Sequence, residues 1–260
     1  MLQGGLVDWD GTLANTPMRQ YKWFSHWAKI NNNKKFDLSF EEFLPLYNKI
    51  LDEKNVQAFY DEFELPCDMN NRNHPVWQGY EYFKSINPVE LYVGAEKALK
   101  EVWGMGRLSK DPRNNKAMRL AINTTNSWKS IYPELIQHNI LHYFDSHCTD
   151  ENLKEFEGSG NHNAIKKPSK VSVALMLNIL DSDGEMTFHI DDTVAGLKAS
   201  NDVRRFGGLK SENLITIGAG QGFEGYDHLN RGYKTNGTTI HFNEVIEDIR
   251  QWPDVIKKYM

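Results

Sequence analysis

Two aspartates near the start of the chain have the residue type and spacing that phosphoryl transfer requires. The segment Leu6-Val7-Asp8-Trp9-Asp10-Gly11-Thr12 opens with an apolar pair and then carries two carboxylates one residue apart. An ionised aspartate can attack phosphorus and form an aspartyl phosphate. A second carboxyl two residues later can protonate the leaving oxygen and then deprotonate water. Asp8 is therefore the candidate nucleophile, and Asp10 is the candidate general acid and base.

The same chemistry needs hydrogen-bond donors for the phosphate oxygens and a positive charge near them. Thr124 follows the apolar run that ends at Asn123, and its hydroxyl and the next amides can bind a phosphate oxygen. Lys167, which precedes a proline, can supply a point charge to the same anion. Both residues are doubled in the chain, so Thr125 and Lys166 remain alternatives for these roles.

A second group of acids, Asp191-Asp192, ends another apolar stretch. Mg²⁺ prefers oxygen ligands in octahedral geometry and is commonly held by one or two carboxylates together with waters and substrate phosphate. A compact cluster of carboxylates would repel itself without a bound cation. We therefore predict Mg²⁺ as the cofactor, with Asp8, Asp10 and Asp192 as its ligands. Backbone carbonyl oxygens of Trp9 and Asp10 are further candidate ligands from the same loop.

These residues fall where strands and helices are expected to alternate. Buried strands are predicted at residues 6–7, 119–123, 186–190 and 213–217, and helices at 94–103, 128–138, 170–180 and 195–201. Alternation of this kind predicts an α/β fold with a doubly wound, Rossmann-like parallel sheet. Ligands bind such sheets at the carboxyl ends of the strands, which is where the candidate residues lie.

Residues 16–88 differ in character from the rest of the chain. They are rich in aromatic and charged residues, with helical periodicity at 21–30, 40–51 and 56–63, and prolines at 66, 75 and 88 divide them. We predict that this stretch is an inserted, mainly helical cap domain. The catalytic core is then formed by residues 1–15 and 89–260.

Composition excludes several functional classes. The 260 residues carry a formal net charge of -5, and the basic residues are scattered, so a nucleic-acid partner is not expected. Two cysteines without metal-ligand spacing predict neither a disulfide framework nor a cysteine metal site. No signal segment or membrane span is predicted, and we expect a cytoplasmic protein. The oligomeric state is not readable from the sequence.

The segment Gly218-Ala219-Gly220-Gln221-Gly222-Phe223-Glu224-Gly225 contains the G-x-G-x-x-G pattern of dinucleotide sites. The pattern lies near the end of the chain, and the residues that follow it are punctuated by glycine and asparagine. No strand ending in an acid comes about 20 residues later, as a dinucleotide fold requires. We therefore predict no organic cofactor, and interpret the segment as a flexible loop near the active site.

Taken in order, these motifs resemble those of the haloacid dehalogenase (HAD) superfamily, with a layout similar to phosphoglycolate phosphatases. Asp8-Trp9-Asp10-Gly11-Thr12 resembles the first motif, Thr124 the second, Lys167-Pro168 the third and Ile190-Asp191-Asp192-Thr193 the fourth. The resemblance implies a Mg²⁺-dependent phosphoric monoester hydrolase. It also implies catalytic roles for Asp8, Asp10, Thr124 and Lys167, and a small phosphorylated metabolite as substrate.

One departure and two alternatives accompany this resemblance. Many members of the family carry an acid four residues after the last motif's aspartate, but this chain has Gly196 there, so Asp191 is the candidate for the additional acid or for orienting a metal-bound water. A phosphosugar mutase would use the same residues, and a catalytically silent binding or regulatory protein would keep the same fold. The identity of the substrate is left open.

Overall fold

The computed structural model describes residues 2–108, 117–158, 160–182, 186–206 and 213–260. The chain divides into two compact units. One is formed by Met1–Ala14 together with Leu91–Met260, and the other by Asn15–Glu90. The two connections between the units run side by side, because Ala14 and Leu91 form an antiparallel bridge within the first unit.

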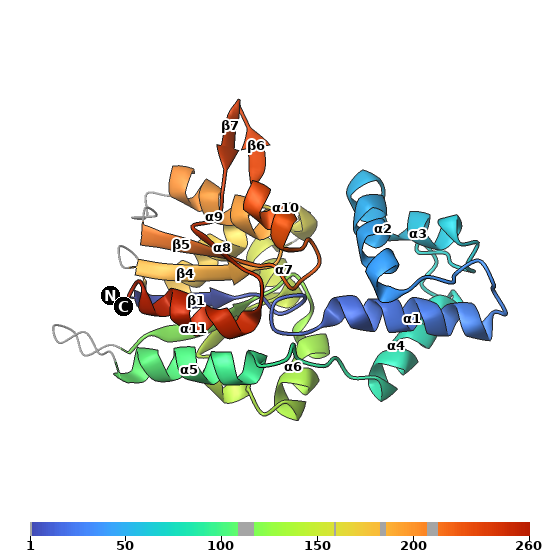
Figure 1. Cartoon of the computed structure of the whole chain (residues 1–260), viewed down its shortest axis with the longest axis horizontal. Helices are drawn as coiled ribbons and strands as arrows, with labels where there is room; N and C mark the ends of the chain where they lie inside the picture. The colour runs from blue at the N-terminus through green and yellow to red at the C-terminus, as the bar shows by residue number, and fades with distance from the viewer. Residues whose placement is uncertain (1, 109–116, 159, 183–185, 207–212) are drawn as a thin grey trace. The chain divides into compact units, whose positions relative to one another are not determined.

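The first unit is built on a parallel sheet of six strands in the order β3-β2-β1-β4-β5-β8. Figure 1 shows β1, β4 and β5 side by side in this sheet. Its strands are β1 (Leu2–Val7), β2 (Arg119–Asn123), β3 (Ser146–Cys148), β4 (Met186–Asp191), β5 (Leu214–Ala219) and β8 (Glu244–Ile246). The strand order reverses direction at β1, so this is a doubly wound α/β sheet of the predicted class. A separate antiparallel hairpin is formed by β6 (Tyr233–Thr235) and β7 (Thr238–Ile240).

Helices cover both faces of the sheet. The α-helices of the first unit are α5 (Ala95–Leu108), α6 (Trp128–Gln137), α7 (Asp150–Glu157), α8 (Val171–Ile179), α9 (Val194–Phe206), α10 (Tyr226–Arg231) and α11 (Trp252–Lys257). On one face, apolar residues of α7, α8 and α9 pack with Leu6 and Ala121 in a single core cluster. On the other, the Trp252 indole of α11 meets the Phe188 ring edge-on. Burial on both faces fits the largely apolar character of β5, whose six residues are all buried.

Four helices make up the second unit: α1 (Thr16–Ile30), α2 (Phe40–Glu53), α3 (Val56–Glu62) and α4 (Pro75–Ile86). Side chains that cap their N-termini fix where they start. Asn15 accepts a hydrogen bond from the amide of Met18, and Ser39 forms a reciprocal capping box with Glu42. The core of this unit is aromatic, and Phe24 lies at its centre in contact with five other rings, those of Phe36, Phe43, Tyr47, Phe59 and Tyr60.

Two helices contradict the expectations from sequence. No helix was predicted between residues 63 and 88, but α4 begins at Pro75, in the first turn, where proline is tolerated because that amide has no helical partner. The residues after the glycine-rich segment were expected to be irregular, yet Tyr226–Arg231 form α10 between Gly225 and Gly232. In the described parts of the chain, none of the helices combines the length and the apolar character needed to cross a membrane.

Candidate active site

The candidate residues gather at the carboxyl edge of the sheet because their strands are neighbours. Asp8 directly follows β1, Thr124 directly follows β2, and Asp191 is the last residue of β4. The order β2-β1-β4 places these three strand ends side by side. Asp8 is anchored from β4, since its amide donates to the carbonyl of Ile190 at 3.0 Å. The fold therefore assembles in one place residues that are far apart in the sequence.

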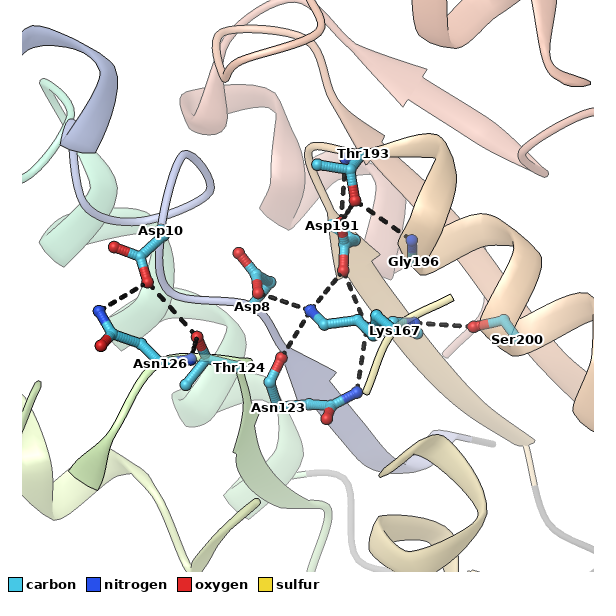
Figure 2. A network of polar contacts seen from close by, with 11 residues as sticks. Asp8, Asp10, Asn123, Thr124, Asn126, Lys167, Asp191, Thr193, Gly196 and Ser200 are labelled. Carbon is cyan, nitrogen blue, oxygen red and sulfur yellow. Dashed lines mark hydrogen bonds and ion pairs between the residues drawn. The ribbon is translucent and has the colours of Figure 1, made fainter. Parts of the chain in front are cut away.

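Lys167 is the centre of this arrangement (Figure 2). Its Nζ donates to Asp8 Oδ1 at 2.6 Å, to Asp191 Oδ2 at 2.7 Å and to the carbonyl oxygen of Asn123 at 2.8 Å. Its side chain is only 7% exposed. Lys166, by contrast, pairs with Asp150 away from this group. Of the two adjacent lysines that the sequence left open, Lys167 is the one beside Asp8.

The charges in this buried group are strongly coupled. Burial raises the pKa of Asp8 to about 7, against the effect of Lys167 and with a further contribution from Asp191. Burial also opposes ionisation of Asp191, but Lys167 outweighs it and holds the pKa of Asp191 below its ordinary value. The two carboxylates in turn keep the pKa of Lys167 above its ordinary value in spite of burial. Lys167 is thus a fixed positive charge between an ionised Asp191 and a titratable Asp8.

Asp10 faces the loop after β2. Its Oδ2 accepts hydrogen bonds from Asn126 Nδ2 at 3.1 Å and from the Thr124 hydroxyl at 3.4 Å (Figure 2). Thr124 is 2% exposed, whereas Thr125 is exposed to solvent. Thr124 is therefore the threonine that meets the first motif. Asn126 was not anticipated from the sequence, and no spacing rule would have selected it.

Asp192 is held by the glycine-rich segment. Its Oδ2 accepts a hydrogen bond of 2.7 Å from the amide of Phe223. A Cβ added to Gly11 or Gly222 would lie about 2 Å from the Asp192 side chain, at 2.0 and 2.3 Å respectively, so these glycines allow the two loops to approach it closely. The segment is thus part of the site, although its G-x-G-x-x-G pattern belongs to no dinucleotide-binding helix.

Asp192 is a buried carboxylate close to other acidic groups. Burial, together with the nearby charges of Asp8 and Asp191, raises the pKa of Asp192 well above its ordinary value. Two buried carboxylates with raised pKa values are the environment that a bound cation relieves. Across the described residues, no three histidine, cysteine, aspartate or glutamate side chains form a metal-binding group. The carboxylates of Asp8, Asp10 and Asp192 therefore do not gather around one point, because the Asp10 side chain is hydrogen-bonded to Asn126.

Gly196 makes room for Asp191. Gly196 lies in the first turn of α9, where a Cβ would be 2.1 Å from Cγ of Asp191 and 2.2 Å from its Oδ2. Asp191 Oδ1 also accepts two hydrogen bonds from Thr193, at 2.9 Å from the amide and 2.6 Å from the hydroxyl. The Asp191 carboxylate therefore occupies the space that a side chain at position 196 would need.

We expect Gly196→Ala to displace Asp191 and, through it, Lys167. Overpacking at a buried position costs about 1–3 kcal/mol of unfolding free energy, and the misplaced charges should lower turnover at least about tenfold. Gly104→Ala is the matched control, since Gly104 is also helical but has no heavy atom within 4 Å of an added Cβ. Urea unfolding and kinetic measurements on both variants test this. Equal behaviour of the two variants would show that Gly196 has no steric role.

His189 lies beneath the site and was not anticipated. It is two residues before Asp191 on β4, so both side chains are on the same face of the sheet. Its Nδ1 is 2.7 Å from Ser200 Oγ, and its Nε2 is 3.5 Å from both Asn123 Nδ2 and Asp191 Oδ2. Burial lowers the pKa of His189 to about 4, so the ring is neutral at pH 7.

This buried histidine predicts a loss of stability in acid. The folded protein binds fewer protons than the unfolded chain between pH 6.5 and about 4, so unfolding free energy falls as pH decreases through that window. The lowered pKa of His189 corresponds to a loss of about 3 kcal/mol of unfolding free energy, and this loss is complete below pH 4. Urea unfolding of metal-free protein should show a shallower pH dependence in His189→Gln than in the parent. The exposed His142→Gln variant should retain the parent's dependence.

Several solved structures share this fold. A protein from Haemophilus somnus assigned as a phosphoglycolate phosphatase aligns with a TM-score of 0.66 at 14% identity, covering 100% of this chain and 98% of the other. One from Thermotoga maritima assigned as a β-phosphoglucomutase gives 0.63 at 15% identity over 100% of both chains. CbbY from Rhodobacter sphaeroides, solved with xylulose bisphosphate, gives 0.59 at 19% identity over 96% of both.

The chain therefore shares its fold with these solved structures, and with one from Geobacter sulfurreducens described as a HAD-superfamily hydrolase, which gives a TM-score of 0.59 at 11% identity. Sequence comparison adds no closer assignment, because neither a protein-family model nor a curated protein sequence matches the chain. At identities of 20% or less, the structural likeness establishes the architecture alone. What the chain does must be argued from its own site.

Proposed function

We propose that this protein is a Mg²⁺-dependent phosphatase that hydrolyses a small phosphate monoester through an aspartyl phosphate on Asp8. The observation that carries the proposal is Lys167, buried between Asp8 and Asp191 at 2.6 and 2.7 Å. Here a single cation faces two carboxylates, one of them with a pKa raised to about 7, which is typical of a functional site.

Each residue has a definite part in the proposed reaction. Oδ1 of Asp8 is held by Lys167, so Oδ2 attacks phosphorus while the bond from phosphorus to the leaving oxygen breaks. Asp10 gives its proton to that oxygen, and the alcohol departs. Asp10 then takes a proton from water as the water attacks phosphorus, which releases inorganic phosphate and restores the Asp8 carboxylate. Lys167 and the Thr124 hydroxyl face the phosphate oxygens throughout.

The proposed cation is Mg²⁺, with Asp8 and Asp192 as its carboxylate ligands. The Trp9 carbonyl already accepts hydrogen bonds from the amides of Leu13 and Ala14, which favours the carbonyl of Asp10 as the ligand from the loop. When bound, Mg²⁺ would neutralise the two carboxylates and the charge on the phosphate. Asp191, which is engaged with Lys167 and Thr193, then orients the lysine and is not itself a metal ligand.

A screen of phosphorylated metabolites for phosphate release, with and without Mg²⁺, tests the proposal. We expect release from at least one small monoester in the presence of Mg²⁺, and a loss of activity on chelation that added Mg²⁺ reverses. Interconversion of a phosphosugar without phosphate release would instead identify a mutase, the activity assigned to the Thermotoga maritima protein with this fold. Binding of a phosphorylated compound without turnover of any kind would support a regulatory protein.

Three expectations from the sequence stay predictions. We propose that the helical unit, Asn15–Glu90, serves as a cap that contributes to the choice of substrate. This role is supported by its insertion between the first motif and the remaining strands. A cytoplasmic location is supported by the composition alone. The proposed substrate is a small phosphorylated metabolite, as the protein contains no basic stripe that would recognise a nucleic acid.

A further inference from the structure

Asn126, in the loop between β2 and α6, contacts the candidate acid directly. Its Nδ2 donates to Oδ2 of Asp10, which lies 116 residues earlier in the chain. Figure 2 shows the two side chains pointing toward each other, with the Thr124 hydroxyl beside them. An uncharged side chain outside the four motifs therefore holds the carboxyl to which the proposed reaction assigns proton transfer.

The amide group of Asn126 is held in one orientation. Its Oδ1 accepts a hydrogen bond of 2.8 Å from the amide of Ser127, and of the two ends of a side-chain amide only the oxygen can accept. The Nδ2 end must therefore face Asp10, where it donates. The backbone of Asn126 is fixed as well, because its amide donates to the Thr124 hydroxyl at 3.1 Å and its carbonyl accepts from the amide of Asp150 at 2.9 Å. Asn126 thus presents a preorganised donor to Asp10.

Thr124 cannot serve the phosphate and Asp10 at the same time. A threonine hydroxyl has one proton to donate. In the structure that proton is directed to Asp10 Oδ2 over 3.4 Å, which is long for a bond between two oxygens. When the hydroxyl donates to a phosphate oxygen, as the proposed reaction requires, its bond to Asp10 is lost. Asn126 has no such second duty, so it can hold Asp10 whether or not phosphate is bound.

The backbone between the two aspartates of the first motif is tied to the helix that follows Asn126. Trp9 is completely buried, and its Nε1 donates to Oε2 of Glu134 in α6 at 2.9 Å. Helix α6 begins at Trp128, two residues after Asn126. The loop that carries the acid and the side chain that orients it therefore share one support.

We propose that Asn126 is a positioning residue, which orients the Asp10 carboxyl toward the leaving oxygen of the substrate. This role rests on the proposed phosphatase reaction and extends it. A carboxyl oxygen that accepts hydrogen bonds from two donors is disfavoured as the site of the acid proton, so Oδ2 is held while Oδ1 exchanges the proton with the leaving oxygen. Misplacement of a catalytic group by about 1 Å can cost roughly 10²-fold in rate, so one hydrogen bond of this kind has a measurable effect.

The quantity that tests this role is kcat/KM for esters with different leaving groups. It includes the step in which the leaving oxygen departs, and it excludes the later attack of water on the aspartyl phosphate. An alkyl phosphate from the metabolite screen needs a proton on its leaving oxygen, whereas p-nitrophenyl phosphate releases a phenolate that is stable without one.

Asn126→Ala should lower kcat/KM about 10- to 100-fold for the alkyl ester and less than about threefold for p-nitrophenyl phosphate. In an Asp10→Ala background, the same substitution should lower kcat/KM for the alkyl ester less than about twofold, because the group that Asn126 orients is gone. If Asn126→Ala does not fold, Asn126→Asp takes its place, since aspartate can still accept from Ser127 but has no N–H for Asp10.

Ser127→Ala is the matched control for a purely structural effect. It removes the side-chain hydrogen bond of 3.2 Å that caps α6 at the amide of Ser130, but it keeps Asn126. Both variants should lower the midpoint of urea unfolding, because both remove a hydrogen bond at the start of this helix. Only Asn126→Ala should separate the two esters, and Ser127→Ala should change kcat/KM for both by the same factor or not at all.

The outcomes separate this role from the reaction on which it rests. An equal fall in kcat/KM for both esters in Asn126→Ala, or a rise for the alkyl ester, would overturn the positioning role and leave the phosphatase proposal intact. If the parent protein hydrolyses neither ester in the presence of Mg²⁺, the phosphatase proposal fails, and the role of Asn126 fails with it. A fall confined to the alkyl ester, and absent without Asp10, is the result that we expect.

Discussion

Replacing Asp8 with asparagine should abolish turnover while leaving the protein folded. Asparagine keeps the shape of the side chain but has no anionic oxygen to attack phosphorus, so kcat should fall by at least about 10⁴-fold. Stability should not fall in parallel, because burial already disfavours the charged form of Asp8. Steady-state kinetics on the best substrate of the metabolite screen, together with urea unfolding of the same preparation, measure both quantities.

Asp37→Asn is the matched control, since Asp37 is an exposed aspartate of the helical unit. Its kinetics and its unfolding should equal those of the parent. If Asp8→Asn retained parental turnover, Asp8 would not be the nucleophile. If it unfolded, the loss of activity would carry no information about chemistry, and for that reason the unfolding measurement is made first.

Replacing Lys167 with methionine should impair both stability and catalysis. Methionine preserves much of the aliphatic volume but leaves Asp8 and Asp191 buried without their cation, which costs about 3–5 kcal/mol of unfolding free energy. Removal of the positive charge from the phosphate should lower kcat about 10²–10³-fold. Unfolding in urea at pH 8 and at pH 6 measures the first effect, and phosphate release measures the second.

The pH dependence distinguishes an electrostatic cause from lost packing. Without Lys167 the pKa values of both carboxylates rise, so the penalty is complete above those raised values and diminishes as pH falls and the groups take up protons. The variant should therefore lose less stability at pH 6 than at pH 8. The neighbouring Lys166→Met, which breaks only the pair with Asp150, should change neither turnover nor this pH dependence. A pH-independent loss in Lys167→Met would point to packing.

The sheet was predictable because its central strands are buried on both faces. Strand Arg119–Asn123 has the bounds that the apolar run predicts, and the strand expected at 186–190 extends by one residue to Asp191. The short strand Ser146–Cys148 gave no signal, since three residues are too few for a recognisable pattern. Helix α7 was missed for a different reason: Leu153 is its one buried residue in the described structure, so it has no apolar stripe.

Residues of the candidate site were predictable where the proposed chemistry restricts the residue type. They were not predictable where the three-dimensional arrangement selects among residues of the same type. Sequence placed Asp8, Asp10 and Asp192 at strand ends, but it could not separate Lys166 from Lys167, because adjacent side chains point in different directions and the sequence does not say which way. The contact from the Phe223 amide could not be predicted from the sequence, because almost every residue has a backbone amide. His189 did leave a signal: it is a titratable residue in an apolar strand, two residues before Asp191.

Covalent phosphorylation of Asp8 during turnover is the most direct test of the central claim. The parent protein is mixed with the best substrate of the metabolite screen and Mg²⁺, quenched in acid and digested, and the peptides are analysed by mass spectrometry. We predict a phosphoryl group on the peptide that contains Asp8, acid-stable and labile to hydroxylamine, and absent from Asp8→Asn. Turnover of the same substrate with no phosphoryl group on Asp8, or with one on a different residue, would contradict the account.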